Sequence, residues 1–197
     1  NVFTGQCYKV FSVEHTCYIT ALAFSYDGNI VATGSSSADC TVKLWSIHDG
    51  RYLQTCSGHS SGIKCITFST DGKLLASCSR DKTIRFWNVS DGKCVQILYG
   101  HKDEVSHINF NSDGSTLASC SSDQTVKLWD VKQGRVFKTI KGYENEVRAL
   151  VFSPDGEMLA SGHGDTKIRL WDINKGEVLK ILEGHKDTVT SVNVSPD

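Results

Sequence analysis

The sequence predicts an all-β fold, a β-propeller built from four-stranded antiparallel blades. Tryptophan recurs every 42 residues, and three Asp-Gly pairs recur with the same period, each beginning 16 residues before a tryptophan. A fixed period of this length is typical of repeat proteins, in which each unit buries its faces against its neighbours. The positions that carry the period are Trp45, Trp87, Trp129 and Trp171, with Asp71, Asp113 and Asp155.

Within one period, short apolar-rich runs alternate with turns. The runs of one unit are residues 105–110, 116–120, 125–130 and 135–140, and Gly, Asp, Asn or Ser bounds each of them. This spacing predicts a meander of four strands joined by hairpins, and no stretch shows a convincing helical period. We therefore expect one four-stranded sheet per repeat, which is the blade of a propeller. We also expect each chain unit to be offset by one strand from a blade.

The period divides the chain into units. We expect four complete repeats, an outer strand of a preceding blade before them and the start of a fifth repeat after them. The first repeat carries two extra residues between its Asp-Gly pair and Trp45, within residues 34–39, and a hairpin loop tolerates such an insertion cheaply. We interpret the chain as a segment of a longer propeller, with an isolated four-blade arc as the alternative. The expected units are 1–12, 13–56, 57–98, 99–140, 141–182 and 183–197.

Two dipeptides recur in register with the period. Trp-Asp occurs at Trp129 and Trp171 and is relaxed to Trp-Ser and Trp-Asn in the first two units. Gly-His opens three units, at Gly58, Gly100 and Gly184, whereas the first unit has Glu14-His15 and the fourth has Gly142-Tyr143. With these motifs the chain resembles the WD-repeat β-propeller family over nearly its whole length. Four motifs in register are specific for the fold but say little about function.

A Ser, a His and an Asp in one unit suggest a hydrolase, but here the set repeats in every blade, whereas an active site is built once. The resemblance implies instead a buried hydrogen-bonded chain from Trp through Ser or Thr and His to Asp. In the fourth unit Tyr143 replaces the His, so we expect that network to differ. We interpret His107 as a packed strand residue and place His163 near a loop. The network residues are His15, Thr33, Asp39, Trp45, His59, Ser77, Asp81, Trp87, His101, Ser119, Asp123, Trp129, Ser161, Asp165 and Trp171.

Composition narrows the possible partners and location. The formal net charge of −1 gives no electrostatic reason to expect nucleic acid or an anionic membrane, and no apolar run is long enough to cross a bilayer. None of the eight cysteines forms a C-x-x-C pair, so we expect buried, reduced thiols and a cytoplasmic location, with a nuclear or cytoskeletal one open. No spacing indicates a metal site, a phosphate-binding loop, a cofactor or a catalytic residue.

The resemblance also implies a partner-binding face. It is lined by the third and fifth residues after each His and by the residue before each turn Asp. Its charged members carry both signs, which favours a protein or peptide partner over a polyanion, and Arg80 and Arg148 are the expected anchors. The face residues are Tyr18, Thr20, Lys64, Arg80, Glu104, Ser106, Ser122, Glu146, Arg148, Thr188 and Thr190, with Ala38, Gly62 and Gly164 at the remaining positions.

These observations predict a non-catalytic scaffold or sensor that binds other proteins or peptides. We expect it to be part of a longer multidomain protein or of a larger complex. The alternative is an enzyme propeller whose site uses the central channel. That alternative would need convergent acids, bases or metal ligands at positions that break the repeat, and the sequence offers only single charges of mixed sign there.

Overall fold

A computed structural model describes residues 7, 10–11, 15–141 and 145–195. These residues form sixteen β-strands. They contain no helix, and therefore none that could cross a membrane. The strands are β1 (Ile19–Phe24), β2 (Ile30–Ser35), β3 (Val42–Ser46), β4 (Tyr52–Cys56), β5 (Ile63–Phe68), β6 (Leu74–Ser79), β7 (Ile84–Asn88), β8 (Cys94–Leu98), β9 (Val105–Phe110), β10 (Thr116–Ser121), β11 (Val126–Asp130), β12 (Arg135–Ile140), β13 (Val147–Phe152), β14 (Met158–His163), β15 (Ile168–Asp172) and β16 (Glu177–Leu182).

Consecutive strands pair antiparallel into four sheets, β1 to β4, β5 to β8, β9 to β12 and β13 to β16. This confirms the predicted all-β architecture of four-stranded antiparallel blades. The expected offset of one strand between chain unit and blade is wrong, because all four strands of a unit pair with one another. The hairpin that follows each Trp returns the last strand to its own sheet, as β8 pairs with β7 through Ile84 opposite Leu98.

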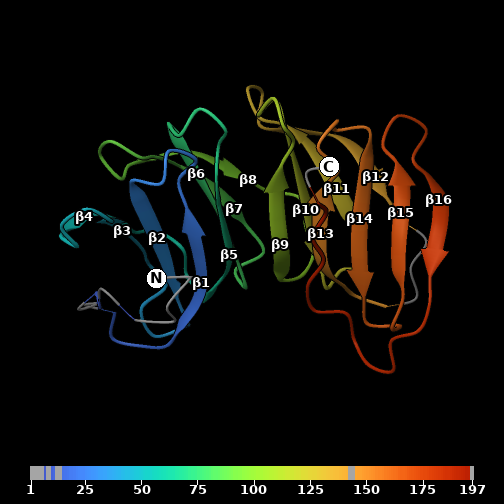
Figure 1. The fold of residues 1–197 in the computed structure, drawn as a ribbon, viewed down its shortest axis with the longest axis horizontal. Coiled ribbons are helices and arrows are strands. Elements are labelled where there is room, and N and C mark those ends of the chain that lie inside the picture. Colours follow the sequence, from blue (N-terminus) through green and yellow to red (C-terminus); the bar gives the residue numbers. More distant parts are fainter. Residues whose placement is uncertain (1–6, 8–9, 12–14, 142–144, 196–197) are drawn as a thin grey trace.

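The four sheets lie side by side in chain order, and within the described residues they do not close into a ring. Figure 1 shows β4 and β16 at opposite ends of the molecule. The first strands of neighbouring sheets contact one another, β1 with β5, β5 with β9 and β9 with β13. The first strand of each blade therefore lies on the inner side of the arc, and the fourth strand lies on the outer side.

The hydrophobic core is divided into clusters, each formed between two successive blades. One cluster joins Val42 and Leu44 of the first blade to Ile63, Phe68 and Trp87 of the second. The second and third blades share a cluster of the same kind, and so do the third and fourth. Burial of apolar surface between blades, rather than within one sheet, is therefore what holds the arc together.

Close packing between blades explains two glycines in second strands. A Cβ on Gly34 would lie 2.7 Å from Cγ2 of Ile63, and a Cβ on Gly162 would lie 2.7 Å from Cγ1 of Val189. The backbone N–H of Val189 also donates to the carbonyl oxygen of His163 at 3.1 Å. Residues of the expected fifth repeat thus pack on the fourth blade as the second blade packs on the first, although residues 183–195 form no strand. The expected outer strand in residues 1–12 lies mostly outside the described residues.

The outward faces of the two end blades expose apolar side chains. Phe24 on β1 is 62% exposed, whereas Phe68 and Phe110 at the same place in the next two blades are 3% and 7% exposed. At the other end, Leu182 on β16 is 37% exposed, whereas its counterpart Leu98 is 1% exposed. Among the described residues, no neighbouring blade covers these side chains as it does inside the arc.

Candidate partner-binding face

The third blade shows how a buried polar chain is built under the candidate face. The indole N–H of Trp129 donates to Ser119 Oγ at 2.7 Å, and His101 Nε2 lies 2.7 Å from the same oxygen. His101 Nδ1 lies 2.9 Å from Asp123 Oδ2, and that carboxylate also accepts from the hydroxyl of Thr125 at 2.6 Å. Each buried donor therefore has an acceptor, as a polar group out of contact with water requires.

The carboxylate at the end of this chain is held in its charged form. Burial alone would raise the pKa of Asp123, but hydrogen bonds from His101 and Thr125 outweigh burial and hold this pKa well below its ordinary value. The backbone N–H of Lys102 adds a further bond at 2.8 Å. The network therefore fixes the loop after His101 to the turn between β10 and β11.

The first two blades carry the same connections. In the first, the insertion does not break the network, because His15 Nδ1 still lies 2.8 Å from Asp39 Oδ2. His15 and Trp45 both bond Thr33 there, and in the second blade His59 and Trp87 both bond Ser77, with His59 also bonding Asp81.

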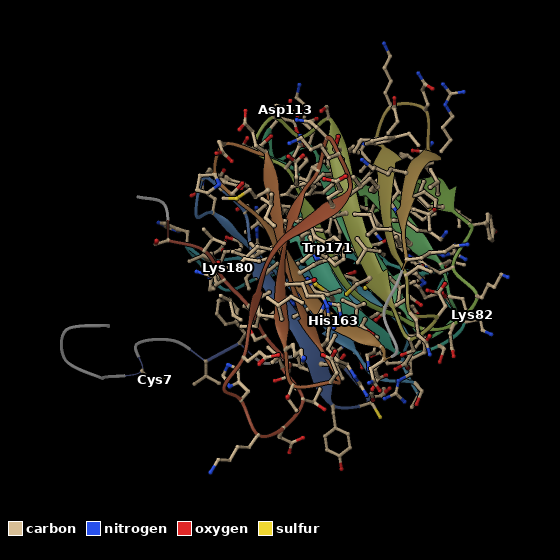
Figure 2. The ribbon with its side chains drawn as sticks, turned by 90° about the vertical axis from the view of Figure 1, so that its right-hand side faces the viewer. Cys7, Lys82, Asp113, His163, Trp171 and Lys180 are labelled. Atoms are coloured by element: carbon tan, nitrogen blue, oxygen red, sulfur yellow. The ribbon has the colours of Figure 1, made fainter. Side chains whose placement is uncertain are left out.

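The hydrogen-bond network of the fourth blade differs from that of the other three. Trp171 donates to Ser161 Oγ at 2.8 Å, as in the other blades, but the imidazole that meets this oxygen is His163, whose Nε2 lies 2.7 Å away. Figure 2 shows His163 and Trp171 together in the interior of the molecule. Asp165 forms a two-pronged ion pair with Arg169, at 3.1 and 2.6 Å. Tyr143, expected to change this network, lies outside the described residues.

The sequence interpretation of His163 as a residue near a loop missed its role. It ends β14 and is completely buried, two residues after Ser161, and side chains two apart along a strand share a face. The signal was present, since the unit that has no His in its opening dipeptide carries a His where the others carry Ser. Burial, followed by the positive charge of Arg169, lowers the pKa of His163 to about 4, so the imidazole is neutral near pH 7.

Backbone hydrogen bonds bring the predicted face positions of each blade together. The N–H of Arg80 donates to the Gly62 carbonyl, and the N–H of Ser122 to the Glu104 carbonyl, each at 3.0 Å. The N–H of Gly164 donates to the Glu146 carbonyl in the same way. In the first blade the partner of Tyr18 is Ser36, so the insertion moves the equivalent position from Ala38 to Ser36. The loop before each first strand and the turn after each second strand therefore form one edge of the arc.

A first group of charges lies where the second and third blades meet. Glu104 of the third blade lies 3.4 Å from the Lys64 Nζ and 3.4 Å from the Arg80 Nε of the second. The Arg80 side chain is 57% exposed, whereas that of Glu104 is 25% exposed. Arg80 therefore retains a free donor surface although its Nε is paired.

A second group of charges lies where the third and fourth blades meet. Ser122 Oγ donates to Glu146 Oε2 at 3.1 Å, and Arg148 forms an ion pair with Oε1 of the same carboxylate. The Arg148 side chain is 34% exposed, and its Nε has no hydrogen-bond partner among the described residues. Arg80 and Arg148 thus both have partly exposed side chains, each beside one carboxylate.

The remaining predicted face residues differ in accessibility. Tyr18 is 84% exposed, and the Thr20 hydroxyl donates to the Ile63 carbonyl of the next blade at 2.7 Å. Thr190 is exposed and Thr188 is partly buried. Ser106 is buried, and its hydroxyl has no partner among the described residues. The predicted positions therefore do not form one uniformly exposed surface.

Two depressions lie between the first and second blades. One of about 270 Å³ belongs to the candidate face and is lined in part by Thr20, Lys64 and Arg80. A larger one of about 650 Å³ is lined mainly by apolar side chains such as Leu53 and Val95, and it contains none of the predicted site residues. In the described part of the chain, no three His, Cys, Asp or Glu residues are placed to hold a metal ion.

The architecture and its motifs are matched by known families. Residues 18–170 match the model of the IFT122 first beta-propeller, and residues 176–197 match the model of the WD domain, G-beta repeat. The chain is therefore a WD-repeat β-propeller. Because the first match spans more than half of its length, it belongs to the family of the IFT122 first beta-propeller.

Several curated proteins resemble shorter stretches of the chain. The apoptotic protease-activating factor 1 of Rattus norvegicus is 37% identical over 78 residues, which are 39% of this chain and 6% of that protein. The WD repeat and SOCS box-containing protein 1 of Xenopus tropicalis is 36% identical over 78 residues, 39% of this chain and 18% of that protein. A probable cytosolic iron-sulfur protein assembly protein, the CIAO1 homolog of Caenorhabditis elegans, is 32% identical over 75 residues, 37% of this chain and 22% of that protein.

Proposed function

We propose that this chain is a non-catalytic scaffold that binds protein partners through the edge that carries Lys64, Arg80, Glu104, Glu146 and Arg148. WD-repeat propellers are in general protein-interaction scaffolds. The names of the relatives refer to processes as different as protease activation and iron–sulfur protein assembly. One fold that serves several processes is expected of a scaffold whose binding residues vary while its blades repeat.

The observation that carries the proposal is the pairing of charges at the two blade boundaries of this edge. The guanidinium groups of Arg80 and Arg148, whose side chains are 57% and 34% exposed, each lie beside a carboxylate supplied by the next or the same blade. A partner that carries both signs can pair with Glu104 and with the open side of Arg80 at the same time. Rigid sheets hold these groups in fixed positions, which lowers the entropy lost on binding.

The test is the double substitution Arg80→Ala and Arg148→Ala. Recovery of partners from a cell lysate, measured by quantitative mass spectrometry, should fall about tenfold or more, because loss of an anchoring Arg commonly costs more than about 1.4 kcal/mol of binding free energy. The melting temperature should stay within a few degrees of the parent, since both side chains are partly solvated.

A matched control removes the same number of positive charges from the opposite edge. Arg51 and Lys93 lie in the hairpins between third and fourth strands, where their side chains are 73% and 80% exposed and each pairs with one Asp. Arg51→Ala with Lys93→Ala should leave partner recovery unchanged. If the control pair reduces recovery as much as the Arg80 and Arg148 pair, the binding edge is misassigned.

We further propose that the protein works in a reducing compartment, the cytoplasm, as part of a larger complex. Cys56, Cys78 and Cys120 are buried thiols that form no disulfide. Free buried thiols are typical of proteins kept under reducing conditions. Isotope-coded alkylation of the protein in intact cells would measure the redox state of each cysteine directly, and stable cysteine pairs would contradict this location.

A further inference from the structure

One group of side chains lies where the second and third blades meet and plays no part in the proposed function. Cys65 on β5 faces Cys78 on β6 as its register partner, and His107 on β9 faces Cys120 on β10 in the same way. Because β5 and β9 are neighbouring first strands, these two pairs come from adjacent blades. Three cysteines and one histidine are thereby gathered on both sides of one blade boundary.

The Cys65 thiol lies at this boundary. Its Sγ is 3.7 Å from the carbonyl oxygen of Ile108, the residue that follows His107 on β9. Cys65 and His107 are both partly buried, whereas Cys78 and Cys120 are completely buried. Cys65 is therefore the more accessible cysteine of the pair that β5 and β6 form.

The same positions are filled differently in the end blades. Ala21 faces Gly34 in the first blade, and Ala149 faces Gly162 in the fourth. Ala and Gly satisfy the packing of these strands, so neither sulfur nor imidazole is needed for the fold at this place. The two middle blades therefore carry thiol and imidazole groups at positions where the end blades have only Ala and Gly.

The surroundings favour a thiolate at Cys65. A hydrogen bond from Cys78, together with the charge and hydrogen bond of His107, outweighs burial and holds the pKa of Cys65 well below its ordinary value. Burial would lower the pKa of His107, but the negative charge of Cys65 raises this pKa above its usual range. Desolvation raises the pKa of Cys78 instead, so Cys78 stays a thiol.

We propose that Cys65 is a site of oxidation by small hydroperoxides, with His107 as its proton donor and Cys78 as the thiol that closes a disulfide. Register partners on antiparallel strands have Cα atoms about 4.5–5.5 Å apart, within the range that disulfides span. The product is a reversible crosslink between β5 and β6.

The reaction balances with hydrogen peroxide as the oxidant. The Cys65 thiolate attacks one peroxide oxygen, the O–O bond breaks, and the departing hydroxide takes a proton from the His107 imidazolium to leave as water. Cys65 is then a sulfenic acid. The Cys78 sulfur attacks the Cys65 sulfur and the S–O bond breaks, while the Cys78 proton leaves with the hydroxyl as the second water. Two cysteines are oxidised, and one peroxide is reduced to two waters.

The experiment treats the full chain with one equivalent of hydrogen peroxide at about pH 7. The remaining thiols are then blocked with N-ethylmaleimide, and the peptides are analysed by mass spectrometry. We expect a disulfide between Cys65 and Cys78 that dithiothreitol reverses, formed before the exposed Cys94 is oxidised. Oxidation of Cys94 while Cys65 remains reduced would overturn the proposal.

Three variants separate the roles. With Cys78→Ala, Cys65 should stop at the sulfenic acid and be trapped by dimedone, whereas the matched change Cys120→Ala in the next blade should leave the disulfide unchanged. His107→Ala, which places there the residue found in the fourth blade, should slow oxidation of Cys65 roughly three- to tenfold. A disulfide from Cys65 to Cys120, or an unchanged rate in the His107 variant with the parent melting temperature, would each refute the assignment.

Discussion

His163 couples the stability of the fourth blade to pH. The pKa of this buried imidazole is lowered to about 4 in the folded protein, first by desolvation and then by the charge of Arg169. In the unfolded chain an ordinary His has a pKa of about 6.5. Between these values the unfolded state binds more protons than the folded state. The contribution to stability is therefore fully present above about pH 6.5 and is lost as the pH falls towards about 4.

The size of the effect follows from the two pKa values. For one such group, lowering the pH from about 7 to about 4.5 removes about 2 kcal/mol from the free energy of unfolding. We expect His163→Ser to abolish this part of the pH dependence. Serine is the residue at the equivalent position in the other three blades, Ser35, Ser79 and Ser121, so the substitution keeps a side chain that this fold accepts.

The measurement is urea denaturation of the parent and of the His163→Ser variant at both pH values. The quantity compared is the change in unfolding free energy between the two pH values within each protein. Any constant cost of the substitution therefore cancels, and other titrating groups such as His101 contribute to both proteins alike. Equal pH-dependent losses in the two proteins would refute the conclusion that His163 is buried in its neutral form.

Two further comparisons test the packing and the networks. Asp123→Ala should cost about 1–3 kcal/mol in urea denaturation, because buried donors lose their acceptor. Asp165→Ala should cost less, since the Asp165 side chain is 20% exposed and that of Asp123 only 6%, and equal losses would contradict the different hydrogen-bond network of the fourth blade. Phe110→Ala should cost about 3–5 kcal/mol by the same assay. Phe24→Ala in this chain should cost less than about 1 kcal/mol because that ring is mostly exposed, and a similar loss at both positions would mean that Phe24 is covered.

The fold could be predicted because each structural signal occurs in several repeats, so each inference rests on several independent copies. Trp87 and Trp129 are separated by one period, and each is preceded by the same turn and the same alternation of apolar residues. A wrong reading of one strand would have been corrected by its copies. The offset between unit and blade was not determined by this pattern, because the order of strands along the chain does not reveal which neighbour the last strand pairs with.

The exceptions to the repeat were harder to predict. Sequence position alone placed Ala38 before the turn aspartate of the first blade, but the longer loop there brings the backbone of Ser36 to Tyr18. Likewise, the sequence showed a His at position 163 in a unit without the opening His, but it did not show that this imidazole bonds Ser161 from the same strand. Both outcomes depend on the local path of the backbone. Each occurs in only one of the four repeats, so the other repeats offered no copy from which to infer it.

The charge pairs of the candidate face lay beyond sequence reasoning for another reason. Lys64 and Glu104 are 40 residues apart in the chain, and their contact depends on the distance between blades and on side-chain rotamers. The sequence predicted that both signs would occur on the face. It did not predict that Glu104 would be shared between Lys64 and Arg80, which leaves Arg80 as the more accessible of the two cations.

The division of the core between successive blades has a consequence for how the chain folds. Each described blade packs against the adjacent repeat, so none of the three core clusters described above requires the two ends of the arc to meet. The free energy is then close to a sum of terms for single repeats and for boundaries between them, as in a one-dimensional lattice. Order can begin at any pair of blades and spread outward by closing loops of about one repeat each, which keeps the entropic cost of every step small.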